Sequence, residues 1–416
     1  MEIRTFTERL LEFPTVDGGE AEAAAWTRDR LDELGFETYE WEADAEALSQ
    51  HSSFPDDPAL IDTEDRPSVA GVLEFGDPDA GPTLILNGHL DVVPADEDAW
   101  SSDPFTPTWG ETDDGEETLT ARGAADMKTQ VATCVFAALD AADRAEAAEM
   151  DGRLVVEAVA GEEEGGIGAA AAALSNPYPF ERDAAIVAEP TELRPLTATE
   201  GTVMKRLEIQ GRAAHAATRW RGEDVLPHFE QIRAAFKDLE AERGETVTHP
   251  LYEEYPVPWP IVIGIVEAGN WASSVPSSLT AEMRFGVAPG ETVDEVERQY
   301  EEALQAVVEA DDWLSEHPPT FERFSIQFEP AETDPEEPIV RTLQAAMLDT
   351  GLPDTDPRGA TYGADSRHFV AAGIPTVVFG PGSVEQAHFP DETIVWPDVE
   401  QARETIAETA VQFLQS

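Results

Sequence analysis

The sequence predicts an α/β protein in which a central, mostly parallel sheet is flanked by helices and interrupted by an inserted ferredoxin-like α+β domain. Two observations predict the sheet: short apolar runs alternate with helical patterns up to residue 195, and the same texture returns near the C-terminus. A third observation predicts the insertion, because a β-α-β-β-α-β order occupies the middle of the chain.

The first part of the chain alternates predicted strands and helices. Apolar runs predict strands at 36–41, 68–74, 83–88, 153–160 and 184–188. Helical periodicity predicts helices at 3–13, 20–34, 126–143 and 168–174. The acidic stretches punctuated by Pro and Gly are expected to be surface loops, at 42–66 and 93–117.

The middle of the chain has its own pattern. Strands are predicted at 202–210, 260–268, 278–286 and 320–329, and helices at 224–241 and 291–310. A helical pattern at 336–349 and a buried strand at 374–380 then resume the α/β texture. We therefore expect one α/β domain in two parts, 1–198 and 331–416, with a second domain, 199–330, inserted between them.

The net charge is unusual for a globular chain. Asp and Glu number 86 against 26 Lys and Arg, which gives −60. Such a surface repels phosphate backbones and anionic lipid, so we expect neither a nucleic-acid partner nor a membrane partner. Lysines are scarce and the acids are spread along the whole chain, so we interpret them as adaptation to a salty cytoplasm. Binding of cations or of a basic partner is the alternative.

Other features of the sequence predict a cytoplasmic protein. Cys134 is the only cysteine, so no disulfide can form within the chain. The first residues carry acids and lack the apolar segment of a signal peptide. No apolar run approaches the roughly 18 residues that a membrane span needs.

Five short stretches carry the residues that can do chemistry. Each ends a predicted strand or opens a loop. The stretches are 84–91 with His89 and Asp91, 121–128 with Asp126, 161–168 with Glu162, Glu163 and Glu164, 187–191 with Glu189, and 379–392 with His388.

Each stretch by itself has an ordinary explanation. A His-x-Asp pair is more often structural, an Asp at a helix start is most often an N-cap, and a charge run is usually a solvated face. Together they place two histidines and several carboxylates at strand ends, where open α/β sheets bind ligands. Nitrogen and carboxylate ligation suits zinc or another divalent transition ion.

The order and local sequence of these five stretches resemble the cocatalytic two-zinc hydrolases. This family includes acetylornithine deacetylase, succinyl-diaminopimelate desuccinylase, aminoacylase and the glutamate carboxypeptidases, and the resemblance covers essentially the whole chain. It implies two Zn ions, with Co or Mn as alternatives at one or both positions. The implied ligands are His89, Asp126 and Glu189 for one metal and Asp126, Glu163 and His388 for the other, with Asp126 bridging.

The resemblance also implies roles around the metals. Asp91 is expected behind the metal site, Glu162 is expected to be the general base, and a cis peptide bond is expected after Asp126. The run of three glutamates leaves the register open. Either Glu162 is the base with Glu163 a ligand and Glu164 solvated, or the assignment shifts by one residue.

The inserted domain resembles the lid and dimerisation domain of the family. Its stretch 211–216 matches one whose histidine reaches the active site of the partner subunit, so His215 is expected to donate to an oxyanion there. This implies a homodimer through the inserted domain. Arg284 and Arg367 fall where the family tends to hold a substrate carboxylate, a task that suits bidentate donors. Surface ion pairing is the alternative for both arginines.

The expected function follows from the resemblance. We expect a metal-dependent hydrolase that cleaves the amide bond of an N-acyl amino acid, of the acetylornithine deacetylase or succinyl-diaminopimelate desuccinylase kind. A carboxypeptidase or dipeptidase acting on a short peptide is the alternative. A non-catalytic binding or regulatory relative is a third hypothesis.

Overall fold

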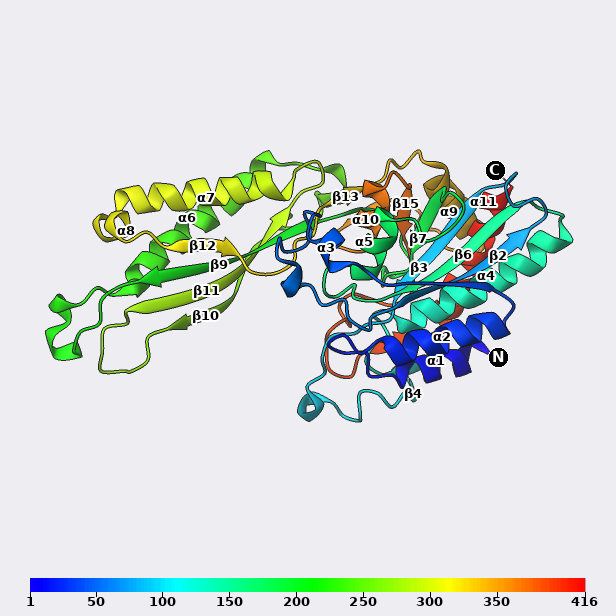
Figure 1. The fold of residues 1–416 in the computed structure, drawn as a ribbon, viewed down its shortest axis with the longest axis horizontal. Helices are drawn as coiled ribbons and strands as arrows, with labels where there is room; N and C mark the ends of the chain where they lie inside the picture. Colours follow the sequence, from blue (N-terminus) through cyan, green and yellow to red (C-terminus); the bar gives the residue numbers. More distant parts are fainter. Residues whose placement is uncertain (416) are drawn as a thin grey trace.

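The computed structural model describes residues 1–415 and confirms the α/β fold with a separate antiparallel sheet (Figure 1). The large sheet has the strand order β1-β2-β6-β3-β7-β15-β8-β13, with β14 beside β8. Its strands are β1 (Glu37–Trp41), β2 (Ser68–Phe75), β3 (Thr83–His89), β6 (Gly152–Val159), β7 (Ala184–Val187), β8 (Leu196–Thr199), β13 (Ala331–Glu332), β14 (Arg358–Ala360) and β15 (Thr376–Val378).

The centre of the large sheet is parallel. Strands β6, β3, β7 and β15 are parallel neighbours, while β1, β2, β8 and β13 join through antiparallel pairs. In the register, Asn87 of β3 lies opposite Glu157 of β6 and Val187 of β7. The carboxyl ends of these central strands therefore meet at one edge of the sheet, which is where the functional side chains lie.

Helices cover both faces of the large sheet. One face packs against α1 (Ile3–Leu11), α2 (Ala21–Glu33), α4 (Lys128–Ala147), α9 (Pro338–Asp349) and α11 (Trp396–Leu414). The other face packs against α5 (Ile167–Leu174) and α10 (Ser366–Ala371). Side chains alternate between the two cores along each strand, so Leu84 and Leu86 face the first core while Ile85 faces the second.

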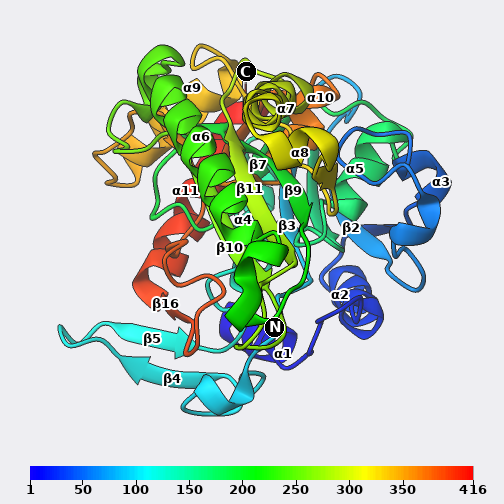
Figure 2. The same ribbon diagram turned by 90° about the vertical axis from the view of Figure 1, so that its left-hand side faces the viewer.

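The antiparallel sheet has the order β10-β11-β9-β12, as in a ferredoxin-like arrangement. Its strands are β9 (Gly201–Gln210), β10 (Ile261–Ala268), β11 (Ser278–Val287) and β12 (Thr320–Arg323), and its helices are α6 (Val225–Thr246), α7 (Val293–Ala310) and α8 (Asp312–Glu316). Figure 2 shows α6 and α7 on the same side of this sheet. Packing of Phe236, Phe285 and Tyr300 gives this region an aromatic core of its own.

The chain passes between the two sheets at Glu200, directly after β8, and again between β12 and β13. We propose the division into 1–198, 199–330 and 331–416, whose boundaries lie near these crossings. Among the described residues, none of the helices is both long and apolar enough to span a membrane.

The structure has short helices and strands in two stretches that are expected to be loops, so these two predictions are wrong. The stretch 93–117, expected to be a loop, contains η2 (Glu97–Ala99) and β4 (Thr108–Glu111), and β4 pairs with β5 (Glu117–Thr120). Strand β5 also pairs with β16 (Thr393–Val395), a partner so distant in sequence that local patterns cannot show it. The other expected loop, 42–66, contains α3 (Ala45–Leu48) and η1 (Pro58–Leu60).

Two further differences concern the C-terminal half. The strand predicted at 320–329 ends at Arg323, and Phe328 forms only an isolated bridge with Thr202. Helix α11 was not predicted, although its buried residues Val399, Ala402, Ile406 and Ala410 follow helical spacing.

Candidate metal centre and active site

The functional side chains gather at the carboxyl ends of the four central parallel strands. His89 ends β3, Glu162 and Glu163 lie in the loop after β6, Glu189 follows β7, and His388 lies in the loop after β15. Parallel strands place the loops that follow them at the same edge of a sheet, which explains how residues far apart in sequence come together.

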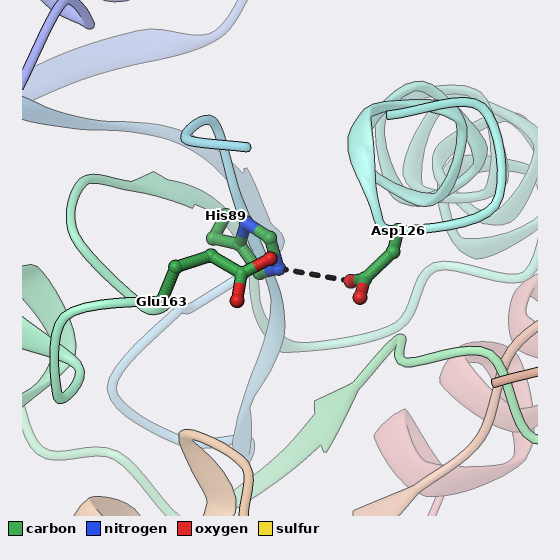
Figure 3. Close-up of side chains that lie close together, drawn as sticks. All are labelled: His89, Asp126 and Glu163. Carbon is green, nitrogen blue, oxygen red and sulfur yellow. Dashed lines mark hydrogen bonds and ion pairs between the residues drawn. The ribbon is translucent and has the colours of Figure 1, made fainter. Parts of the chain in front are cut away.

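His89, Asp126 and Glu163 form the centre of this group (Figure 3). Nε2 of His89 lies 3.1 Å from Oδ1 of Asp126, which lies two residues before the start of α4. One ligand atom from each of the three residues lies within 4.8 Å of the others. One imidazole and two carboxylates at this spacing are suitable ligands for a divalent ion, so these residues could hold a metal. The peptide bond after Asp126 is cis, as the resemblance implied.

His388 approaches the same carboxylates from the solvent side. Its Nε2 lies 3.1 Å from Oε1 of Glu163 and 3.7 Å from Oδ2 of Asp126, and its side chain is half exposed. The two oxygens of Asp126 therefore face different histidines, with Oδ1 toward His89 and Oδ2 toward His388. A carboxylate shared by two ions needs this kind of arrangement.

Asp91 lies behind the centre and holds two of its parts. Its Oδ1 and Oδ2 accept hydrogen bonds from the backbone N–H groups of Glu162 (3.1 Å) and Glu163 (2.9 Å). Nδ1 of His89 lies 2.9 Å from the Asp91 carbonyl oxygen, which leaves Nε2 facing the metal site. Burial alone would raise the pKa of Asp91, but His89 and the two N–H donors outweigh it and lower that pKa to about 2.

Glu162 and Glu189 line one cavity with the metal-site residues. This cavity has a volume of about 260 Å³. Its wall consists of Asp126, Glu162, Glu163, Glu189, Pro190, Thr202, Met204, Arg284, Phe328, Tyr362, Gly363, Val384, Ala387 and His388. Burial, together with the charges of Asp365 and Glu189, raises the pKa of Glu162 well above its usual range in the metal-free chain.

The three adjacent glutamates have different surroundings. Glu162 is buried in the cavity wall, and Glu163 faces His388. Glu164 turns away, and its Oε2 accepts a hydrogen bond from Nη1 of Arg66 at 2.6 Å. Arg66 is buried and also pairs with the buried Glu20. Glu164 is exposed, as expected, and it also forms an ion pair with the buried Arg66.

The structure brings Arg284 to the cavity but not Arg367. Arg284 of β11 lines the wall and donates to Oε1 of Glu200 and to the Thr361 carbonyl, both at 3.2 Å. Arg367 is buried and donates to the carbonyls of Ala364 (3.0 Å) and Gly165 (2.7 Å). Within the described chain, Arg367 is not part of the cavity wall, and its guanidinium instead supports the loop that carries Glu162.

His215 is also not part of this cavity in the described chain. Its Nδ1 accepts a hydrogen bond from the backbone N–H of Ala217 at 3.0 Å, at the start of η3 (Ala216–Arg221). The segment after β9 lies at the end of the antiparallel sheet that is far from the large sheet (Figure 1). The expectation that His215 donates to an oxyanion in a partner's site stays a prediction.

Sequence reasoning missed two residues of this region. Tyr362 lines the cavity, and its hydroxyl lies 3.4 Å from the Pro190 carbonyl; no motif marks it. Glu392 follows His388 by four residues and is fully buried. It stood within the fifth stretch, and its place in a motif was the signal that could have found it.

Comparison with known proteins agrees with this geometry. Residues 85–412 match peptidase family M20/M25/M40. The acetylornithine deacetylase of Pectobacterium carotovorum subsp. carotovorum (strain PC1) is 28% identical over 337 residues, which cover 79% of this chain and 80% of that protein.

Solved structures share the fold at low sequence identity. A metallo-carboxypeptidase of the M20 family from Sulfolobus solfataricus is 16% identical with a TM-score of 0.73, covering all of both chains. A dinuclear metal-binding peptidase of the M20 family from Bacillus subtilis is 16% identical with a TM-score of 0.59, covering 99% of this chain and 98% of its own. The family match spans most of the chain and includes every residue of the metal centre, so the chain belongs to peptidase family M20/M25/M40 and is a hydrolase of amide bonds.

Proposed function

We propose that this protein removes the acyl group from an N-acyl amino acid by metal-assisted hydrolysis. One observation carries the proposal: the buried carboxylate of Glu162 lies in the wall of the same small cavity as the His89–Asp126–Glu163 centre. The acetylornithine deacetylase at 28% identity supports this substrate class. A peptidase acting on a short peptide is the second candidate, supported by the metallo-carboxypeptidase of the same fold.

We propose two zinc ions, with Co or Mn as alternatives. His89, Asp126 and Glu189 would hold one ion, and Asp126, Glu163 and His388 the other. The opposite directions in which the two Asp126 oxygens face support a shared ligand. Bound there, a divalent ion supplies a Lewis acid that makes water more acidic and polarises a carbonyl.

The residues of the chain then divide the remaining work. Glu162 accepts the proton of the attacking water and returns it to the leaving amine. Asp91 holds the His89 ring and the backbone of Glu162 and Glu163 in place. Arg284, which lines the cavity, would bind the substrate carboxylate with its guanidinium N–H groups.

We propose that the protein is a homodimer through the region 199–330. Strand β10 is at the edge of its sheet and pairs only with β11 among the described strands. Three of its apolar side chains are about half exposed, namely Val262, Ile265 and Val266. An unpaired apolar edge favours association with a second strand.

A substrate panel tests the proposed function. Purified protein is expected to contain bound metal and to release amine from N-acetylornithine or N-succinyl-diaminopimelate. A chelator should abolish the activity, and added zinc should restore it. Cleavage of dipeptides alone would establish the second candidate. A metal-loaded protein that cleaves none of these compounds would contradict both candidates and favour a non-catalytic relative.

A further inference from the structure

Glu392 is the acceptor of an unusually complete set of hydrogen bonds. The residue is fully buried and lies between His388 and β16. Its Oε2 accepts from Nη1 of Arg122 at 2.7 Å and from the backbone N–H of Gly123 at 3.1 Å. Its Oε1 accepts from the backbone N–H groups of Ala125 at 2.7 Å and Asp126 at 2.9 Å. Four donors thus occupy all the acceptor positions of one carboxylate.

These bonds determine where Asp126 lies. Three of the four donors are main-chain groups of residues 123–126, the loop that ends at Asp126. Three N–H groups of one short loop can all donate to the same carboxylate only if the loop holds a single conformation. A neutral glutamine could not replace the carboxylate, because its NH₂ group would face N–H donors instead of accepting from them.

Further hydrogen bonds near Glu392 connect the segment of Asp126 with the segment of His388. The backbone carbonyl of Glu392 accepts from the N–H of Ala121, and Thr120 and Thr393 are joined through their hydroxyl groups at 2.7 Å. The segment that carries His388 is therefore attached to the segment that carries Asp126 along its length. In the proposed metal site, Asp126 and His388 share an ion, and Nε2 of His388 lies 3.7 Å from Oδ2 of Asp126.

We propose that Glu392 is a positioning residue for the metal site of Asp126, Glu163 and His388. It holds the loop of Asp126 against the loop of His388 before metal arrives. This inference rests on the proposed function, because it takes Asp126 and His388 as metal ligands. Pairing of β5 with β16 already anchors the chain at Thr393, so the side-chain bonds of Glu392 serve the loop 122–126 and not the sheet.

Two variants test the proposal. Glu392→Gln keeps the size of the side chain and removes acceptor capacity. Asp391→Asn is the matched control, because it makes the same change of charge one residue away. The Asp391 side chain is directed at Ser101, with its carboxylate accepting from the Ser101 N–H (2.8 Å) and hydroxyl (2.7 Å). Asparagine also tolerates the positive φ of 55° at this position.

The first measurement is amide hydrogen exchange in protein freed of metal by a chelator. In Glu392→Gln, the amides of Gly123, Ala125 and Asp126 should exchange about ten-fold faster or more, while the central strands keep their protection. Asp391→Asn should match the wild type. Unchanged exchange at these amides, or faster exchange throughout the chain, would overturn the proposal. Because no metal or substrate is present, this result does not depend on the proposed function.

The second measurement is zinc binding by titration calorimetry. Glu392→Gln should bind one of two zinc ions about 10- to 100-fold more weakly, the usual effect of losing a group that orients a metal ligand. Local loss of amide protection with unchanged zinc affinity would overturn the metal-positioning role. If Glu392→Gln does not fold, Glu392→Asp decides, because it keeps the charge and withdraws it by one methylene. Wild-type protection and affinity in Glu392→Asp would then overturn the proposal.

Discussion

At the scale of single residues, the glutamates 162–164 show how surroundings give identical side chains different tasks. Glu162 is buried in the cavity wall, Glu163 faces His388, and Glu164 pairs with Arg66. A loop with glycines at both ends turns sharply enough to separate them, since Gly161, Gly165 and Gly166 all have positive φ. This geometry supports Glu162 as the base and Glu163 as a ligand.

Substitutions of the three glutamates should therefore have different effects. Glu162→Gln keeps the size of the side chain but removes the base, so kcat should fall about 10²- to 10⁴-fold with both metals bound and KM nearly unchanged. Glu163→Gln should weaken one metal, and excess zinc should restore part of the rate. Metal analysis of the purified variants, with kinetics in the presence and absence of added zinc, measures these differences.

Glu164→Gln is the control for this series. It should keep both metals and most of the activity, because Arg66 retains its buried partner Glu20. The opposite pattern would show a register shifted by one residue. In that case Glu163→Gln would keep both metals but be inactive, and Glu164→Gln would lose one ion.

At the scale of elements, β9 links the two sheets and separates His215 from the cavity. The strand begins next to Glu200, at the large sheet, and the loop with His215 follows its far end. The cavity wall in the described chain does not include His215, which is compatible with the proposal that His215 acts in the site of a second subunit. The exposed edge β10 is the surface that we propose for that association.

Mixing two inactive variants tests this arrangement. His215→Ala and Glu162→Gln should each be nearly inactive as pure proteins. After subunits exchange, random pairing makes half of the dimers mixed, and each mixed dimer has one complete site, so about a quarter of the wild-type rate should return. No recovery in a preparation in which light scattering and native mass spectrometry show mixed dimers would contradict a role for His215 in the partner's site.

At the scale of the whole molecule, the charge of −60 is the dominant property. All three lysines are bound within the protein. Lys128 is buried and donates to the Phe13 carbonyl, Lys205 pairs with Glu297 and Glu301, and Lys237 pairs with Glu240. The other ion pairs with Asp and Glu side chains in the described chain are formed by arginines and histidines. Compact folding therefore brings many unpaired carboxylates close together, which destabilises the native state in dilute buffer.

Salt should stabilise this protein strongly. Molar potassium chloride shortens the screening length to about 3 Å, so repulsion between surface carboxylates nearly disappears. The midpoint of thermal unfolding, followed by circular dichroism, should rise steadily from dilute to molar potassium chloride. The same midpoints measured in a sucrose series of equal viscosity control for a non-ionic effect. Equal midpoints at low and high salt would contradict the interpretation of the acids as salt adaptation.

Local patterns in the sequence predict the parallel sheet centre, the ferredoxin-like order and the residues that lie together at the candidate metal centre. These features depend on local information. Strand and helix patterns are visible within short windows, and parallel strands bring their carboxyl ends together in any sheet of this kind. His89, Asp126, Glu163 and His388 each follow or open a predicted element, so their meeting at one edge could be predicted.

The neighbours of each of these residues, in contrast, depend on long-range contacts of the folded chain. Arg367 is expected from the sequence to bind a substrate carboxylate or to form a surface ion pair, but folding buries it against the Gly165 carbonyl, about two hundred positions away in sequence. The partner of β5 and the donors to Glu392 are equally distant. The surroundings of a side chain depend on such long-range contacts. Burial determines whether a charged group contacts substrate, metal or backbone, and it is a property of the packed molecule and not of any short stretch of sequence.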